Sequence, residues 1–249
     1  MKKTLTTNQL VIVAAVFLTA FANVAFFRNL GATFAGQPNA LVHEILLGVA
    51  LFCVMILFLL LFSFRRVIKP ALMLLFLVAA LCAYFMDSYN VVIDHEMLLN
   101  VVATNSSETG DLLTPRFVMY VMLMALVPSY LIWDLPIARL DVRQAWLSRL
   151  KLGGSAVGVL LAVVLIFGSF FASFVREHKT LRYYTNPLTP IYSAYKFSKK
   201  NMVANTGPVE VIGTDAAIPP TDKDRELVIM VLGETARADR FSLNGYERK

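Results

Sequence analysis

The chain has 249 residues, of which 57% are hydrophobic and only 16% charged, with a formal net charge of +6. This composition is too apolar for an ordinary soluble enzyme, and the apolar residues are gathered in long blocks, which indicates a protein that crosses a membrane several times. The basic residues flank these blocks or cluster between Arg176 and Lys200. Because no nucleic-acid recognition motif accompanies them, the charge favours contact with anionic lipid and argues against nucleic-acid binding.

Five apolar blocks are near the length of about 20 helical residues that crosses a bilayer core. They lie at about residues 10–27, 44–64, 71–86, 117–133 and 154–175. The first block follows Lys2 and Lys3 and also resembles a secretory signal peptide, with Ala20-Phe21-Ala22 as a cleavage site. Its apolar run continues past that point and more spans follow, so we predict an uncleaved first span. Residues 1–175 are therefore expected to form a domain of five transmembrane helices.

The charges of the short loops are distributed asymmetrically. One set of loops carries most of the basic residues: Lys2, Lys3, Arg65, Arg66, Lys69, Arg139, Arg143, Arg149 and Lys151. The opposite loops carry Arg28 and Arg116 and no lysine. The positive-inside rule then predicts a cytoplasmic N-terminus, and five crossings place the chain after about Arg176 on the other side. This is the topology of a multi-pass protein of the bacterial inner membrane with a periplasmic C-terminal part.

The predicted spans contain few residues that could have a catalytic or transport role. No charged residue lies at the middle of a span, which counts against a transporter with an ion or proton pathway. Cys53 and Cys82 lie inside apolar blocks and are expected to act as small hydrophobic residues. A non-catalytic membrane scaffold remains an alternative at this point.

The outer loop at residues 87–116 contains apolar residues at helical spacing, including Ile93 and Met97, which predicts an amphipathic helix on the membrane surface. Asn100, Thr104 and Glu108 follow at intervals of four residues, which places an amide, a hydroxyl and a carboxylate on one helix face. Such a face can bind a polar headgroup, or it can simply be solvated. The neighbouring run at residues 94–96 is Asp-His-Glu, but consecutive residues of a helix do not converge on one metal ion.

Residues 176–224 form a juxtamembrane segment followed by a linker. Tyrosines and Phe197 alternate with lysines and arginines up to Lys200, a pattern typical of a segment at the level of the lipid headgroups. Residues 201–224 contain Gly207-Pro208 and Pro219-Pro220 and read as a linker.

Residues 225–249 contain the start of a further domain. An apolar run at 227–232 predicts a strand buried on both faces, as in α/β folds with a parallel sheet. It ends in Gly233 and Glu234, so a carboxylate is expected at the C-terminal edge of the sheet, where such folds keep their sites. Some 25 residues are too few to bury a core, so we expect this domain to be incomplete.

Glu234 is a candidate metal ligand, because zinc accepts carboxylate oxygen. A single carboxylate does not define a metal site, and a structural role for Glu234 is the alternative. From residue types alone, no other member of such a site can be assigned.

The run from Gly233 to Tyr246 reads Gly-Glu-Thr-Ala-Arg-Ala-Asp-Arg-Phe-Ser-Leu-Asn-Gly-Tyr and resembles the first active-site motif of the phosphoethanolamine transferases. These are membrane enzymes of the alkaline phosphatase and sulfatase superfamily that modify lipid A and confer polymyxin (colistin) resistance. The outer-loop run Val-Ile-Asp…Met…Asn…Thr…Glu also resembles that family. The resemblance implies a truncated alkaline phosphatase-like α/β domain after the five transmembrane helices. It further implies that Glu234 binds zinc and that Asn100, Thr104 and Glu108 bind the phosphoethanolamine headgroup.

The resemblance also implies a reaction. Phosphatidylethanolamine is the donor, lipid A is the acceptor, and a threonine carries the phosphoethanolamine between them. That threonine belongs to a downstream motif beyond Lys249, and Thr235 has no such role in the family. We therefore expect the 249 residues alone to insert in a membrane and to transfer nothing.

Other acceptors remain open within the same layout. A glycerol-phosphate transferase has a Glu-Ser-Phe type motif, where this chain has Glu234-Thr235-Ala236. Related transferases that share the Gly-Glu-Thr motif act on a core sugar or a periplasmic glucan.

Overall fold

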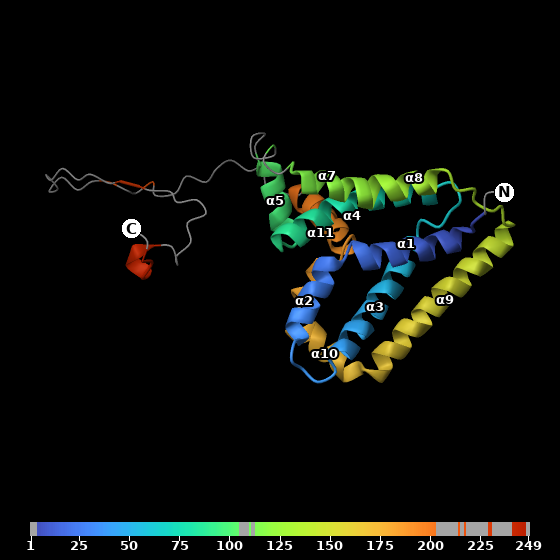
Figure 1. Cartoon of the computed structure of the whole chain (residues 1–249), viewed down its shortest axis with the longest axis horizontal. Coiled ribbons are helices and arrows are strands. Elements are labelled where there is room, and N and C mark those ends of the chain that lie inside the picture. Colours follow the sequence, from blue (N-terminus) through green and yellow to red (C-terminus); the bar gives the residue numbers. More distant parts are fainter. Residues whose placement is uncertain are drawn as a thin grey trace. The chain divides into compact units, whose positions relative to one another are not determined.

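The computed structural model describes residues 4–104, 110, 113–202, 214, 217, 229–230 and 241–247. The chain divides into two compact units, Met1–Ala204 and Asn205–Lys249. Within its described residues the first unit is helical, apart from one isolated bridge between Leu5 and Ile137. Its elements in chain order are α1 (Thr7–Phe21), α2 (Val24–Phe34), α3 (Ala40–Leu60), α4 (Ile68–Tyr89), α5 (His95–Ala103), α7 (Pro115–Val121), η1 (Met122–Leu126), α8 (Val127–Trp133), α9 (Val142–Ile166), α10 (Gly168–Glu177), η2 (Leu181–Tyr184) and α11 (Leu188–Met202) (Figure 1).

Four helical stretches among the described residues are long and apolar enough to cross a membrane: α3, α4, the continuous stretch Pro115–Trp133, and α9. A fifth crossing results if α1 and α2, which meet at a bend of 54°, count as one broken span. The prediction of a helical membrane domain with about five spans is therefore confirmed.

Two predicted spans differ from the observed helices. The first span was expected to be continuous over 10–27, whereas α1 ends at Phe21 and α2 continues to Phe34. The fifth was expected at 154–175, whereas α9 begins at Val142 and ends at Ile166. The helix α9 begins earlier because it includes the basic residues that precede the apolar block, and it ends inside that block, where α10 follows from Gly168.

Two buried asparagines hold the break between α1 and α2. The Asn23 amide donates to the carbonyls of Leu18 (2.9 Å) and Asn186 (2.7 Å), and its oxygen accepts the Asn186 backbone N–H (2.8 Å). The Asn186 amide donates to the carbonyls of Ala22 (3.0 Å) and Ala79 (2.8 Å). Both asparagines are 0% exposed. A broken helix in a membrane domain needs such partners for its backbone, so this pair makes the break possible.

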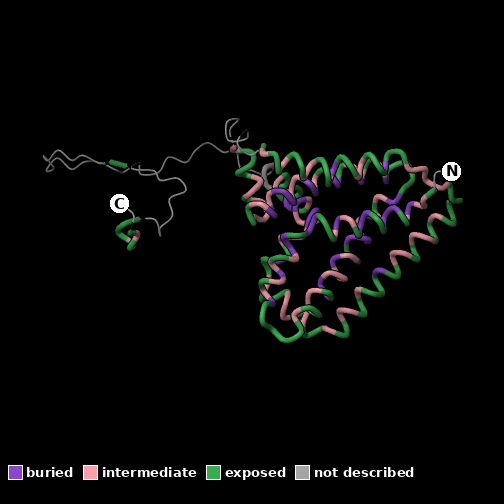
Figure 2. Tube along the Cα trace, viewed as in Figure 1, coloured by how far each residue is buried: buried purple, intermediate pink, exposed green. Residues whose placement is uncertain are grey.

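The buried side chains lie mainly on α1, α3 and α4, which form the centre of the bundle (Figure 2). One apolar cluster joins these helices to Ile132 and Ala156, and Leu188 and Ile191 of α11 pack against it. The outer helix α9 is mostly exposed, with apolar side chains such as Leu165 (78%) facing outward. Exposed apolar helix faces of this extent are expected where lipid replaces water.

The helix that contains Pro128 is widened just before the proline. At η1 the Val127 N–H donates to the carbonyl of Met122, five residues earlier. Proline lacks an N–H, and its ring clashes with the carbonyl four residues before it, so a π-helical turn relieves the clash.

One end of the bundle gathers the basic loops. Leu5 exchanges backbone hydrogen bonds with Pro136 and Ala138 (3.1 and 2.9 Å). The Lys69 ammonium donates to the carbonyl of Trp133 at 2.7 Å, and the Arg149 guanidinium lies 4.5 Å from the Phe64 ring centre. We call this the basic end. The helix α4 starts here and leads to α5 at its other end, so α5 lies away from the basic end (Figure 1).

The second unit is described only in part. Ile229 and Met230, within the predicted buried strand, are not in a strand and are 75% and 89% exposed. A strand buried on both faces needs neighbouring strands, and none of the described residues of this unit forms one. The short helix η4 (Ser242–Asn244) ends at Gly245, whose φ of 89° suits glycine.

The asparagine pair yields a first prediction. Asn23→Ala removes three hydrogen bonds and leaves the buried N–H and carbonyl of Asn186 without these partners, at a cost of about 1–3 kcal/mol for each group. We expect a clear decrease in the thermal unfolding temperature of the detergent-purified protein. The control is Gln37→Ala, at an exposed position between α2 and α3. Equal unfolding temperatures for the two variants would contradict a stabilising role for the pair.

Candidate functional site

A junction of hydrogen bonds fixes the C-terminal end of α4. Asn90 follows α4 in the left-handed conformation, and its side-chain oxygen accepts from Arg28 (3.0 Å) and Asn29 (2.8 Å) of α2. The Arg28 guanidinium also donates to the carbonyls of Met86 (3.3 Å) and Asp87 (3.1 Å). A cation at a helix C-terminus is favourable because the free carbonyls carry partial negative charge.

The same junction reaches η2, because the Tyr184 hydroxyl donates to the carbonyl of Asn90 at 2.9 Å. Beneath it, Ala25, Met86 and Ile93 are buried together, with Met97 packed against them. The helix α5 is therefore attached to the bundle both by polar contacts and by its apolar side.

The helix α5 begins and ends with side-chain caps. The Asp94 carboxylate accepts the Met97 backbone N–H at 2.9 Å, an N-cap that satisfies one free donor of the first turn. Thr104 follows the last residue of α5 in an extended conformation, and its hydroxyl donates to the Asn100 carbonyl at 2.7 Å. The predicted continuous helix face over Asn100, Thr104 and Glu108 is thus interrupted at Thr104, because the helix ends there.

The sequence-predicted site residues are only partly within the described chain. Asn100 is exposed and Thr104 is half-buried, and the two are joined by the bond just described. Glu108 and Glu234 lie outside the described residues. In the part of the chain that the structure describes, no group of three or more His, Cys, Asp or Glu side chains is placed to bind a metal ion.

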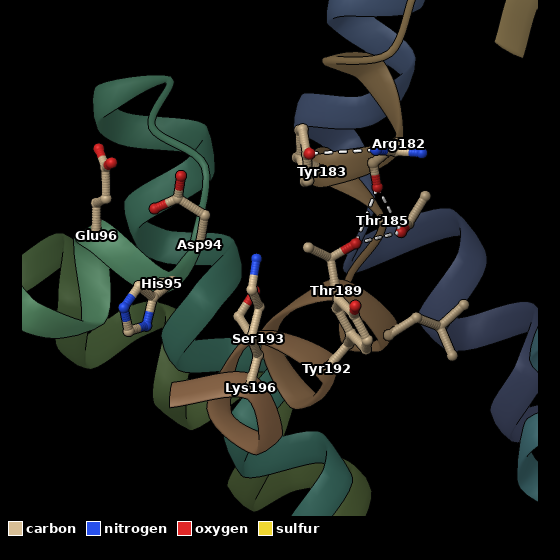
Figure 3. A pocket seen from close by; sticks show the side chains of 11 residues that line it. Asp94, His95, Glu96, Arg182, Tyr183, Thr185, Thr189, Tyr192, Ser193 and Lys196 are labelled. Atoms are coloured by element: carbon tan, nitrogen blue, oxygen red, sulfur yellow. Dashed lines mark hydrogen bonds between the residues drawn. The ribbon is translucent and has the colours of Figure 1, made fainter. Parts of the chain in front are cut away.

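A pocket of about 760 Å³ lies between α5 on one side and η2 and α11 on the other (Figure 3). Its lining residues are Asp94, His95, Glu96, Arg182, Tyr183, Thr185, Leu188, Thr189, Tyr192, Ser193 and Lys196. Figure 3 shows the side chains of α5 on one wall, Arg182 and Tyr183 on the opposite wall, and Lys196 rising from α11 between them. The pocket is at the α5 end of the bundle, away from the basic end.

The backbone of Arg182 is held by two hydroxyl groups. Thr185 and Thr189 both donate to the Arg182 carbonyl, at 2.8 and 2.9 Å. The guanidinium donates to the Tyr183 hydroxyl at 3.2 Å. These contacts link η2 to the start of α11 and fix the position from which the Arg182 side chain extends.

The charges of the pocket act on Tyr183. The hydrogen bond and the positive charge of Arg182 lower the pKa of this phenol, Lys196 lowers it further, and Asp94 acts in the opposite direction. Tyr183 therefore lies within reach of charges from all three elements that line the pocket.

Sequence reasoning missed this pocket. It treated residues 94–96 only as a metal cluster to be rejected, and it read Arg182 and Lys196 as part of a general basic segment. The tyrosines between these cations were the available signal for a headgroup-level segment. The pairing of that segment with α5, across a sequence separation of more than 80 residues, could not be read from local pattern.

The chain matches a known protein family over most of its membrane domain. The family model for the phosphoethanolamine transferases EptA and EptB matches residues 51–202, a range that includes α4, α5, η2 and α11. The chain belongs to the EptA/EptB phosphoethanolamine transferase family. The sequence-based recognition of this family is thereby confirmed.

Individual relatives agree with the family. The phosphatidylethanolamine transferase Mcr-1 of Escherichia coli is 39% identical over 244 residues, covering 96% of this chain and 45% of Mcr-1. The phosphoethanolamine transferase EptA of Escherichia coli K12 is 31% identical over 252 residues, covering 96% of this chain and 44% of EptA. The chain thus spans less than half the length of these curated relatives.

A solved structure has the same fold. The integral membrane lipooligosaccharide phosphoethanolamine transferase A (EptA) of Neisseria meningitidis superposes with a TM-score of 0.87 at 23% identity. The match covers 99% of this chain and 46% of that protein. The helical membrane domain therefore has the fold of the membrane part of that protein.

The α4–α5 junction yields a second prediction. Arg28→Met removes hydrogen bonds to the α4 carbonyls and to Asn90, and bonds from a charged donor each contribute about 1.5–3 kcal/mol. We expect the backbone amide hydrogens of α5 to exchange with solvent roughly tenfold faster, because the free energy of local opening decreases.

The matched control is Arg176→Met, which removes an equal charge from an exposed arginine whose ion pair with Glu177 is also exposed. Such surface pairs contribute little. Unchanged exchange in Arg28→Met would show that the junction does not hold α5.

Proposed function

We propose that the full-length protein transfers phosphoethanolamine from phosphatidylethanolamine to a phosphate group of lipid A at the outer face of the bacterial inner membrane. The observation that carries this proposal is the family match over the membrane helices, α5 and α11. Both substrates are lipids, and a bundle of apolar spans with a polar pocket at one end gives access to lipid headgroups.

The proposed orientation follows from the loop charges. The basic end, with Lys69 and Arg149, faces the cytoplasm, and α5 and α11 face the periplasm. The headgroup-binding residues and the downstream catalytic domain then lie on the same side of the membrane.

The proposed reaction has two steps. A threonine hydroxyl of the downstream domain attacks the phosphorus of phosphatidylethanolamine, diacylglycerol leaves with the proton, and a phosphoethanolamine-threonine ester forms. A protonated phosphate group of lipid A then attacks that phosphorus through oxygen, and the bond from phosphorus to the threonine oxygen breaks. This creates a diphosphate linkage, and the proton of the lipid A phosphate passes to the threonine oxygen and restores its hydroxyl. Within this chain, Asn100, Thr104 and Glu108 are proposed to hold the donor headgroup.

Zinc is the proposed cofactor, with Glu234 as the ligand that this chain supplies. A carboxylate oxygen is an ordinary zinc ligand, and bound zinc lowers the pKa of a hydroxyl nucleophile. Adding phosphoethanolamine to lipid A offsets a phosphate charge with an ammonium, which weakens attraction of cationic polymyxins and accounts for the proposed resistance.

A third prediction concerns Glu234. The full-length protein is expressed in a polymyxin-sensitive host, and its lipid A is analysed by mass spectrometry. We expect a phosphoethanolamine adduct on lipid A with the wild type. With Glu234→Ala the amount of adduct should decrease by about 100-fold or more, because loss of even a residue that only supports a metal ligand decreases metal affinity or activity by about 10–100-fold. Glu247→Ala, just outside the motif, is the control. Lipid A without adduct in the wild type would reject this acceptor.

A fourth prediction concerns the headgroup residues of the outer loop. Asn100→Ala and Glu108→Ala should each increase the KM for phosphatidylethanolamine by roughly tenfold, because each removes a polar partner of the headgroup. Diacylglycerol release measures donor turnover. Unchanged turnover in both variants would mean that this part of the loop is only a solvated surface.

A further inference from the structure

The pocket carries both signs of charge on separate walls. Asp94 and Glu96 come from the α5 wall, Arg182 comes from η2, and Lys196 rises from α11 (Figure 3). Among the described residues, no hydrogen bond or ion pair joins either carboxylate to Arg182 or Lys196. The four charges therefore do not neutralise one another within the pocket and remain available to a ligand.

The cationic side suits a phosphate group. Arg182 uses one N–H for Tyr183 and keeps further donors of its planar fork, which matches the spacing of phosphate oxygens. Lys196 adds a point charge with three donors. The two threonine hydroxyls are already committed to the Arg182 carbonyl, so their role is to position this arginine.

The acidic side suits a primary ammonium. One Asp94 oxygen accepts the N-cap bond from Met97, and the carboxylate of Glu96 accepts none of the hydrogen bonds in the described part of the chain. A primary ammonium offers three N–H donors to such oxygens, whereas a trimethylammonium offers none. Hydrogen bonds to this wall are therefore available to ethanolamine and not to choline.

The size and place of the pocket fit a lipid headgroup. Its volume of about 760 Å³ lies in the range of small-molecule sites. Tyr192 of α11 lines the pocket and is exposed, and exposed tyrosines are typical of the interface between membrane and water.

We propose that this pocket binds a zwitterionic phosphoethanolamine group, with Arg182 and Lys196 at the phosphate and Asp94 and Glu96 at the ammonium. The proposal rests on the proposed function for the class of lipid, and it adds a second binding position for that lipid, since neither Asn100 nor Thr104 lines the pocket. It also assigns a specificity, because the acidic wall favours phosphatidylethanolamine over phosphatidylcholine.

Native mass spectrometry of the full-length protein tests this binding directly. The protein is released from nanodiscs that contain equal amounts of phosphatidylethanolamine and phosphatidylcholine, and retained lipids are counted. The wild type should retain phosphatidylethanolamine preferentially. Arg182→Gln combined with Lys196→Gln should decrease that retention by about tenfold or more.

The matched control is Lys179→Gln combined with Lys199→Gln. These exposed lysines belong to the same juxtamembrane segment and do not line the pocket, so the control removes the same charge. Equal losses in both double variants would overturn the proposal, because they would indicate only a general attraction to lipid. Retention of phosphatidylethanolamine by the pocket variant at the wild-type level would also overturn it.

Variants of the acidic wall test the specificity. Asp94→Asn preserves the N-cap, since asparagine is an equally good N-cap residue, and it is combined with Glu96→Gln. This double variant should lose the preference for phosphatidylethanolamine over phosphatidylcholine. A preference that persists unchanged would overturn the assignment of the ammonium to this wall.

A competition experiment and a parallel measurement of lipid A complete the test. Soluble phosphoethanolamine added as competitor should displace the lipid if the headgroup alone is recognised, whereas a lack of displacement assigns recognition to the intact lipid. Lipid A from cells that express the same variants is weighed in parallel. If the wild-type protein retains phosphatidylethanolamine but modifies no lipid A, the binding proposal is supported and the proposed acceptor is rejected.

Discussion

The paired amides of Asn23 and Asn186 join two parts of the chain that are 163 residues apart. Each side chain satisfies backbone groups of the other segment, and both are fully buried. In a membrane domain an unpaired backbone group is costly, so the break after α1 and the start of α11 stabilise each other. These hydrogen bonds hold the segment around Asn186, which follows the last span, against α1 and α4. Together with the packing of Leu188 and Ile191 against the central cluster, they place Arg182 and Lys196 on the side of the pocket opposite α5.

The second constraint acts at Asn90, where α2, α4 and η2 meet through Arg28 and Tyr184. It fixes where α5 begins, and thus where the Asp94 carboxylate lies. Together the two polar junctions place opposite charges on facing walls of one pocket, while the apolar surface of α9 remains free for lipid. The bundle thus combines an apolar exterior with a charged pocket at one end, an arrangement that suits the proposed transfer between lipids.

Much of the bundle could be predicted from sequence, because apolar blocks of sufficient length have few alternatives to membrane helices. Family membership was also predictable, since the run from Gly233 to Tyr246 is long and distinctive. The break at Asn23 was not, because a single asparagine within an apolar run gives no indication of a partner near residue 186. The end of α5 at Thr104 was missed for a related reason: regular spacing does not reveal that the backbone becomes extended at this residue. The roles of Glu108 and Glu234 stay predictions, as both lie outside the described residues.

The pocket between α5 and α11 is proposed as a second position that binds the headgroup of the donor lipid. Electron cryo-microscopy of the full-length protein in nanodiscs containing phosphatidylethanolamine tests it most directly. We expect headgroup density in the pocket, with the phosphate against Arg182 and Lys196 and the ammonium toward Asp94 and Glu96. A resolved donor headgroup bound elsewhere, with this pocket containing only water, would contradict it.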